Sequence, residues 1–210
     1  MSRTRLGWLS FATLTVAILC LAAGMAGAQT NGVYQVNYYS HPANGTGQDS
    51  TFHIVNPGTA VTTLDRNGLP LDGQLCANIY VFNDDEQEEA CCGCELTADS
   101  ETTLSLEHDL LVNPINPVNL SHDGVVKIIA GNLNGSPCDP AAEHNPIAPT
   151  PELHAWGTHI QKQGSTVSET EEDFAAAPLS NSELTFAENL CSAIQAQGSG
   201  KGICTCGYGD

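Results

Sequence analysis

Basic side chains are scarce in this 210-residue sequence, which has six Lys or Arg against 24 Asp or Glu and a formal net charge of −18. Nucleic-acid binding needs clustered basic side chains, so this composition excludes a nucleic-acid partner. Long apolar segments are also rare. Beyond the first 28 residues, none approaches the roughly 20 residues that span a bilayer. We therefore expect no membrane contact from the mature chain.

The first 28 residues have the three parts of a secretory signal peptide. Arg3 and Arg5 supply a positive start, residues 9–23 an apolar run, and residues 26–28 a small-residue cleavage site. Retention as a membrane anchor and lipidation of the cysteine inside the run are the alternatives. Cleavage leaves residues 29–210 as a single domain, exported to the periplasm, the cell surface or the extracellular space. This domain keeps four basic and 24 acidic side chains, a net charge of −20, and eight of the nine cysteines.

An even number of cysteines in an exported chain predicts four disulfides. Cys91 and Cys92 are adjacent, so we expect them to have different partners. Links from the central cysteines to those of the C-terminal tail would close loops of roughly 100 residues, each contributing about 4 kcal/mol in the chain-entropy model. The alternatives are a thiolate site for zinc or an iron–sulfur cluster, whose usual spacing is absent, and a redox centre. The eight cysteines are Cys76, Cys91, Cys92, Cys94, Cys138, Cys191, Cys204 and Cys206.

Short β-type segments separated by Pro and Gly turns predict a mainly β fold, an antiparallel sandwich or barrel. Apolar residues are nearly continuous over 75–82, which indicates a strand buried on both faces. Residues 161–178 are polar and acidic, and we expect an exposed excursion there. The expected strands are residues 33–39, 51–55, 75–82, 102–106, 125–130 and 153–160.

One C-terminal helix is predicted over residues 182–196. Ser180 and Glu183 have capping-box spacing, and glycines follow the segment. Cys191 lies on the apolar stripe of this helix, where a disulfide would tie the helix to the sheet. The expected architecture is therefore a disulfide-stapled β domain with one helix.

An acidic segment over residues 84–89 is the candidate metal site. Asp84, Asp85 and Glu86 are hard oxygen ligands that suit Ca²⁺, and Asn83 could add a carbonyl. The spacing is not that of an EF-hand. The alternative is a solvated loop that protects the neighbouring apolar strand from aggregation. Apart from the thiolate alternatives, calcium is the candidate cofactor. We interpret the second acidic run, over residues 169–173, as a solvated surface.

No catalytic residue is assigned. The histidines show no His-Glu-x-x-His spacing, and no Gly-x-Ser-x-Gly elbow is present. Trp156 is the only Trp of the mature chain, and we expect it to pack in the core. The alternative is a sugar-stacking surface formed with Tyr34, Tyr38 and Tyr39.

Four segments together resemble a group of exported, Cys-rich proteins of Acidobacteria that are about 200 residues long. They are His53–Pro57, Leu75–Asp85, Cys91–Cys94 and Gly200–Gly207. The resemblance covers most of the mature chain. It implies an exported protein of a diderm bacterium, and it assigns neither an activity nor a site residue.

Three hypotheses about function follow. The first is a non-enzymatic structural or interaction module that binds other surface proteins or assembles with itself, with residues 33–39 adding to a neighbour's sheet. The second is a Ca²⁺-dependent carbohydrate-binding module, with glycans as partners. The third is a secreted hydrolase, which would need a cleft that joins acids or histidines to a nucleophile.

Overall fold

The computed structural model describes most of the chain beyond residue 31. The expected signal peptide lies outside the described residues. The chain divides into two units, Met1–Thr30 and Asn31–Asp210, and all described elements belong to the second. Among the residues described, no helix is long and apolar enough to cross a membrane. The described residues are 32–40, 49–60, 63–64, 67–68, 70–71, 73–117, 123–133, 138–141, 147–150, 152–163 and 165–207.

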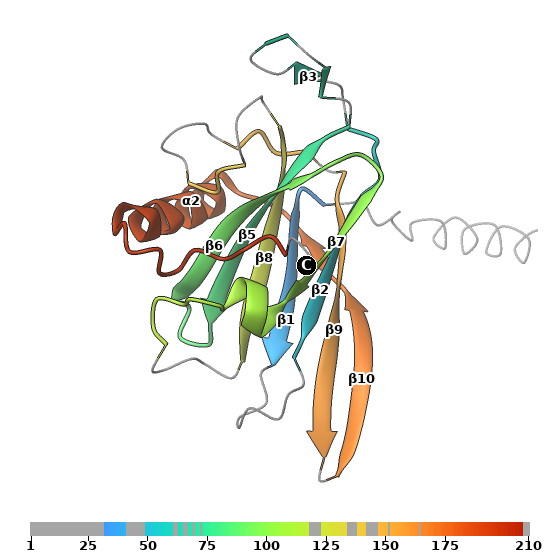
Figure 1. Cartoon of the computed structure of the whole chain (residues 1–210), viewed down its shortest axis with the longest axis vertical. Helices are drawn as coiled ribbons and strands as arrows, with labels where there is room; N and C mark the ends of the chain where they lie inside the picture. The colour runs from blue at the N-terminus through green and yellow to red at the C-terminus, as the bar shows by residue number, and fades with distance from the viewer. Residues whose placement is uncertain are drawn as a thin grey trace, which may run out of the picture. The chain divides into compact units, whose positions relative to one another are not determined.

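Two antiparallel sheets pack face to face, followed in the chain by one helix (Figure 1). This confirms the predicted fold class. The five-stranded sheet has the order β11 (Ala175–Ala177), β1 (Tyr34–Ser40), β8 (Asp123–Asn132), β5 (Leu75–Asn83) and β6 (Glu88–Leu96). The four-stranded sheet has the order β10 (Thr166–Asp173), β9 (His154–Gln163), β2 (Thr51–Asn56) and β7 (Ser100–Ser105). The smaller elements are the hairpin β3 (Thr63–Leu64) and β4 (Pro70–Leu71), and a π-helical turn, η2 (Leu106–Leu110).

The five-stranded sheet is covered on both faces. Its inner face meets the four-stranded sheet in the main core, where Ile79 and Ile128 share one cluster with Phe52 and Leu104. Its outer face packs against helix α2 (Asn181–Ala196) in a second cluster. All nine residues of β5 are therefore buried, as its continuous apolar sequence predicts.

Helix α2 is anchored to the sheet at its first turn. The Ser180 hydroxyl accepts a hydrogen bond from the Glu183 backbone N–H at 3.1 Å, which confirms the predicted cap. The Glu183 carboxylate in turn accepts hydrogen bonds from Lys127 Nζ at 2.7 Å and from the Tyr34 hydroxyl at 3.0 Å. The hydrogen bond from Lys127 lowers the pKa of Glu183. Three elements, α2, β8 and β1, thus meet at one carboxylate.

The predicted donor strand belongs to its own sheet. Strand β1 pairs with β8 on one side and with β11 on the other. Both edges of β1 are therefore paired within the chain over residues 34–36, whereas residues 37–40 pair with β8 alone. This pairing disfavours addition of the first half of β1 to a neighbour's sheet, and self-assembly through residues 33–39 stays a prediction.

The acidic segment is shorter than predicted, because only residues 84–87 form the exposed turn between β5 and β6. The side-chain oxygen of Asn83 accepts hydrogen bonds from the backbone N–H groups of Asp85 and Gln87, at 3.0 and 2.8 Å. This tight turn starts β6 at Glu88, so the last two acids of the run are buried rather than solvated. The expected excursion at 161–178 also differs. It is exposed in β10, but it consists of regular strands that pair with β9 and β1.

Glu88 is a buried acid without a partner. Neither carboxylate oxygen has a hydrogen-bond partner among the described residues, and burial raises its pKa to about 9 against a weaker opposing effect of Lys127. Glu88 is therefore protonated at neutral pH in the folded state, whereas its unfolded pKa is near 4.5. Folding takes up a proton between these two values, so stability falls as pH rises through that window.

We expect Glu88→Gln to stabilise the protein at pH 8 and to leave it unchanged at pH 4. Gln is neutral at both pH values. The free energy of unfolding of the wild-type protein, in contrast, falls by up to about 1.4 kcal/mol per pH unit between the two pKa values of Glu88. Urea denaturation at both pH values measures the effect, with the exposed Glu95→Gln as the matched control. Equal stability of Glu88→Gln and wild type at pH 8 would contradict the assignment.

Candidate functional site

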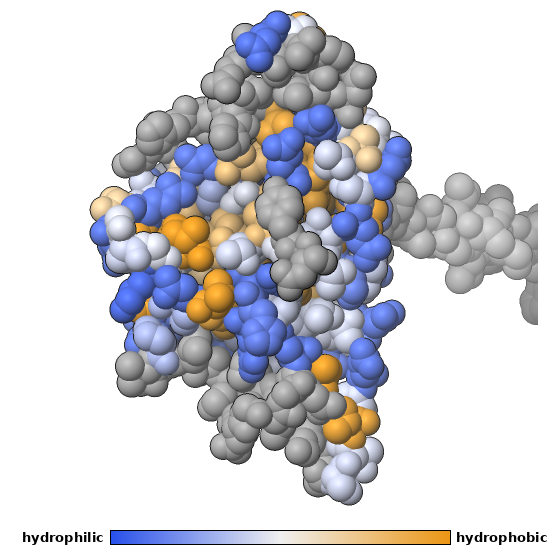
Figure 2. Space-filling model, viewed as in Figure 1, coloured by the Kyte–Doolittle hydropathy of each residue, from blue (hydrophilic) through white to orange (hydrophobic). Residues whose placement is uncertain are grey.

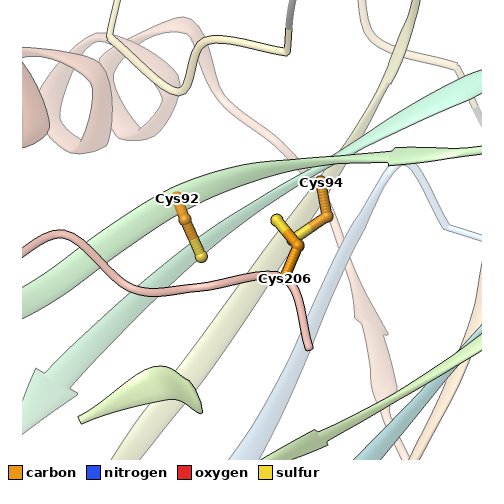
Figure 3. Close-up of side chains that lie close together, drawn as sticks. All are labelled: Cys92, Cys94 and Cys206. Atoms are coloured by element: carbon orange, nitrogen blue, oxygen red, sulfur yellow. A yellow bond between two sulfur atoms is a disulfide. The ribbon is translucent and has the colours of Figure 1, made fainter. Parts of the chain in front are cut away.

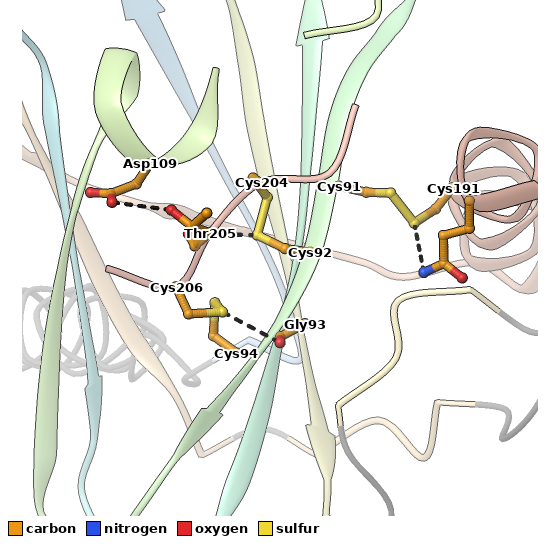
Figure 4. Close-up of a disulfide and its surroundings, with 10 residues drawn as sticks. Cys91, Cys92, Gly93, Cys94, Asp109, Cys191, Cys204, Thr205 and Cys206 are labelled. Atoms are coloured by element: carbon orange, nitrogen blue, oxygen red, sulfur yellow. Dashed lines mark hydrogen bonds between the residues drawn. A yellow bond between two sulfur atoms is a disulfide. The ribbon is translucent and has the colours of Figure 1, made fainter. Parts of the chain in front are cut away.

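All eight cysteines of the described domain form disulfides, and β6 carries three of them. Cys91 points to the outer face of the sheet and bonds to Cys191 of α2, which confirms the predicted link between helix and sheet. Cys92 and Cys94 belong to the main core and bond to the C-terminal tail (Figure 4). The four pairs are Cys76–Cys138, Cys91–Cys191, Cys92–Cys204 and Cys94–Cys206.

The glycine of the Cys-Cys-Gly-Cys segment allows a close approach of a distant loop. A Cβ added to Gly93 would lie 2.5 Å from the carbonyl oxygen of Cys138 and 2.9 Å from the Cβ of Cys138. Only a residue without a side chain therefore lets the loop at Cys138 lie on the sheet, where its disulfide to Cys76 holds it. Every residue of this short segment has a structural role.

The C-terminal tail bridges the two sheets on their β6–β7 side. The Cys91 backbone N–H donates to the Gly202 carbonyl at 2.8 Å, and the Cys204 N–H donates to the Cys91 carbonyl at 3.1 Å. Further along, the Thr205 N–H donates to the Asp109 carbonyl at 2.9 Å, next to β7. Figure 4 shows the Thr205 hydroxyl also meeting the Asp109 carboxylate, at 3.3 Å. The tail thus occupies the seam between the sheets.

The disulfides exclude a thiolate metal site at these cysteines. The sulfur atoms of Cys92, Cys94 and Cys206 lie within 4.8 Å of one another (Figure 3). Each of them is bonded to another sulfur, so none is a thiolate ligand. Four disulfides indicate an oxidising, exported environment.

The calcium candidates lie apart from this scaffold. Asp84, Asp85 and Glu86 are exposed in the β5–β6 turn. Within the described part of the chain, the groups of three ligand atoms that lie within 4.8 Å of one another do not include them. The Asn83 side-chain oxygen is already used by backbone N–H groups. The calcium hypothesis stays a prediction.

The outer face of the four-stranded sheet carries an aromatic pair. His53 of β2 and Trp156 of β9 are register neighbours, and their rings stack at 4.9 Å between centroids and 5° between planes. Trp156 is only partly buried, so the expectation that it packs in the core is wrong. The physical reason is alternation along β9. Ala155 belongs to the core and Gly157 lies against Phe52, so Trp156 between them points outward.

The ring of His53 is held by two neighbours on β7. Its Nδ1 lies 3.1 Å from a carboxylate oxygen of Glu101 and 3.0 Å from the Thr103 hydroxyl. The side chain of His53 keeps 22% of its exposure and that of Glu101 keeps 52%. These contacts engage Nδ1 and fix the ring, while no described hydrogen bond involves Nε2. Asp173 of β10 continues the same row beyond Trp156. We call these five residues the His53–Trp156 face.

The other aromatic candidates do not gather at this face. Tyr34 is buried under α2, and Tyr39 is buried in the main core, so the predicted tyrosine cluster is not exposed as a unit. Tyr38 stays 42% exposed and stacks on the buried His159 at 4.1 Å. Neither nitrogen of His159 has a described hydrogen-bond partner.

The remaining histidines carry no site of their own in the described residues. His108 and His154 are exposed. His41, His122 and His144 lie outside the described residues. The His53–Trp156 pair has no local sequence signature, because the two residues are far apart in the chain. The sequence indicates only that each lies within a strand.

Comparison with known proteins adds little. No family model and no curated protein matches the chain. One solved structure, "Crystal Structure of Thermotoga maritima 1070", has a TM-score of 0.39 and 7% sequence identity, and the match covers 68% of this chain and 94% of that chain.

The two disulfides of the tail should contribute unequally to the free energy of unfolding. We expect Cys94→Ala with Cys206→Ala to cost about 2 kcal/mol, because with Cys92–Cys204 intact that bond closes a loop of only about six residues. Further replacement of Cys92 and Cys204 by Ala should cost roughly 3 kcal/mol more, because with Cys91–Cys191 intact that bond closes a loop of roughly 15 residues. Guanidinium denaturation measures both changes. If the first pair alone costs as much as all four, Cys94–Cys206 holds the tail by itself.

His159 should make the protein less stable in mild acid. Burial lowers its pKa below the ordinary 6.5, so the unfolded chain takes up a proton that the folded chain refuses. Stability therefore falls as pH drops below about 6.5. We expect His159→Phe, which keeps a ring against Tyr38, to lose less stability than wild type between pH 7.5 and pH 5. The exposed His108→Gln should behave like wild type, and an identical acid loss in His159→Phe would refute the prediction.

Proposed function

We propose that this protein is an exported, non-enzymatic interaction module and that the His53–Trp156 face is its ligand surface. The observation that carries the proposal is the contrast between the two sheets. Helix α2 covers the outer face of the five-stranded sheet, whereas in the described residues no helix covers the outer face of the other. A partly exposed aromatic pair on an open face is the kind of surface that binding proteins use.

The surroundings of the pair favour a polar ligand. Glu101, Thr103 and Asp173 place two carboxylates and a hydroxyl beside the rings. In the view of Figure 2, the apolar residues of the surface lie in small groups between hydrophilic ones. Recognition by hydrogen bonds around a ring contact fits this surface better than docking of a large apolar partner.

The proposal includes an export address. Periplasmic, cell-surface and extracellular locations all suit a domain with four disulfides. The resemblance to exported acidobacterial proteins supports a diderm bacterial source within the same proposal. Self-assembly through β1 has less support, because its first three residues are paired on both sides.

Carbohydrate binding is the second candidate function, and the outward position of Trp156 favours it. His53 covers one face of the indole ring, so a sugar would contact the opposite face or the ring edge. The calcium candidates belong to a turn of the other sheet, so carbohydrate binding at Trp156 has no need of them. Within this proposal, binding is calcium-independent.

Trp156 provides a direct test, because the only other Trp, Trp8, lies within the predicted signal peptide. We expect saturable changes in the fluorescence of the mature protein with members of an oligosaccharide panel, equal in EDTA and in Ca²⁺. His53→Ala should weaken binding about tenfold. Phe186→Ala, at an exposed position of α2, should not change it.

Four other results would each contradict part of the proposal. Binding that needs Ca²⁺ would favour the Asp84–Glu86 turn over the calcium-independent site. Binding that His53→Ala leaves unchanged would place the ligand elsewhere. No fluorescence change with any sugar would reject the carbohydrate candidate. Turnover of a bound sugar would reject the non-enzymatic interpretation.

A further inference from the structure

Strands β6 and β11 lie at the two edges of the five-stranded sheet, and β7 and β10 at those of the four-stranded sheet. The four edges differ in what covers them. The tail forms hydrogen bonds with β6 and lies beside β7 through η2. Strand β11 has three residues. Strand β10 has eight, pairs with β9 on one side, and is exposed at every position. It is therefore the long uncovered edge of the described fold, on a hairpin that extends beyond the neighbouring strands (Figure 1).

The free backbone groups of β10 follow from its hydrogen-bond pattern. The Phe174 N–H donates to the Ala155 carbonyl at 2.9 Å, in the same register as the β9–β10 ladder. Antiparallel pairs alternate between hydrogen-bonded and non-bonded positions. The N–H and C=O groups of Val167, Glu169 and Glu171 therefore point away from β9. An extended chain laid along this edge would meet three donors and three acceptors.

The side chains of the edge select the partner. Glu169, Glu171 and Asp173 share one face of the strand, in register with Ile160, Thr158 and Trp156. Neither the Lys127–Glu183 ion pair nor the His53–Glu101 contact involves any of the three acids. A second copy would bring acid against acid, which is unfavourable across a strand pair. A chain with alternating cations would match.

We propose that β10 is a docking edge for an extended, Lys- or Arg-bearing segment of another exported protein. The segment adds to the four-stranded sheet as a fifth strand, through the free backbone groups of Val167, Glu169 and Glu171. Its cations face the carboxylates of Glu169, Glu171 and Asp173. Main-chain hydrogen bonds supply affinity in such strand addition, and the alternating side chains supply specificity. The inference rests on the free backbone edge of β10, whereas the His53–Trp156 face rests on the rings of β2 and β9. The two surfaces adjoin and share Asp173.

Charged edge strands also prevent sheet-to-sheet aggregation, and the experiment must separate the two roles. The probe is a fluorescent ten-residue peptide of alternating Lys and Thr, titrated into the mature protein and followed by anisotropy. Its control is the same peptide with N-methyl groups on alternate amides, which keeps the charge and removes hydrogen bonding along one edge. Both N-methyl registers are used, and we expect one of them to weaken binding at least about tenfold.

Glu169→Pro is the decisive variant. The backbone N–H of Glu169 points away from β9, so proline removes one donor of the docking edge and leaves the hydrogen bonds between β9 and β10 intact. We expect it to weaken binding at least about tenfold, and Glu169→Gln with Glu171→Gln to weaken it about threefold to tenfold. Glu95→Gln with Asp85→Asn removes the same charge from exposed positions on the other sheet, and should change affinity less than twofold.

Several results would overturn the inference. One is equal binding of both N-methyl peptides and the parent peptide, or of Glu169→Pro and wild type, because either leaves only general electrostatic attraction. Another is absence of peptide binding together with dimerisation of the Glu169→Gln, Glu171→Gln protein, because the acids would then only prevent self-pairing. His53→Ala separates the two proposals. Loss of peptide binding in this variant, with Glu169→Pro unaffected, overturns the edge and leaves the His53–Trp156 face standing.

Discussion

The alternation of side chains along β6 is the constraint on which the rest of the structure depends. Successive residues of a strand point to opposite faces, so adjacent Cys91 and Cys92 hold different layers. Cys91 holds helix α2 on the outside, while Cys92 and Cys94 hold the tail on the inside. Gly93 between them receives the loop that Cys138 ties to Cys76. One nine-residue strand thus fixes three segments that are distant in sequence.

This scaffold explains how a chain with many acids and few large apolar residues keeps one sheet face open. The disulfides and α2 close the outside of the five-stranded sheet and the seam between the sheets. The four-stranded sheet then needs no cover of its own, and its outward residues are available for ligands. The same division explains the charges: Glu183 is neutralised at the helix anchor by Lys127, whereas the carboxylates of β10 stay in solvent.

The parts of the fold that the sequence predicts are those with a strong local signal. Strand β5 shows its two buried faces as a continuous apolar run, and α2 shows its cap in Ser180 and Glu183. Strand β6 is not among the expected strands, because Glu, Ala and Gly are not typical of strands and its burial comes from disulfides and neighbouring elements. Strand β10 is not among them for a different reason: no face of it is buried, so its sequence has no apolar period.

The candidate site was less predictable than the fold, because it depends on register between distant strands. Nothing local to His53 or Trp156 indicates that β2 and β9 pair in the register that stacks their rings. The buried Glu88 shows the same limit, since an acid within an acidic run looks solvated until the turn of Asn83 places it inside. Long-range pairing is the common cause.

Strand β6 holds the helix and the tail on opposite faces through specific disulfides. Non-reducing peptide mass spectrometry of the native protein tests this arrangement. We expect Cys91 linked to Cys191, Cys92 to Cys204, Cys94 to Cys206 and Cys76 to Cys138, with no free thiol in the domain. A link from Cys91 to Cys204 or from Cys92 to Cys191, or thiols that bind a metal, would contradict it.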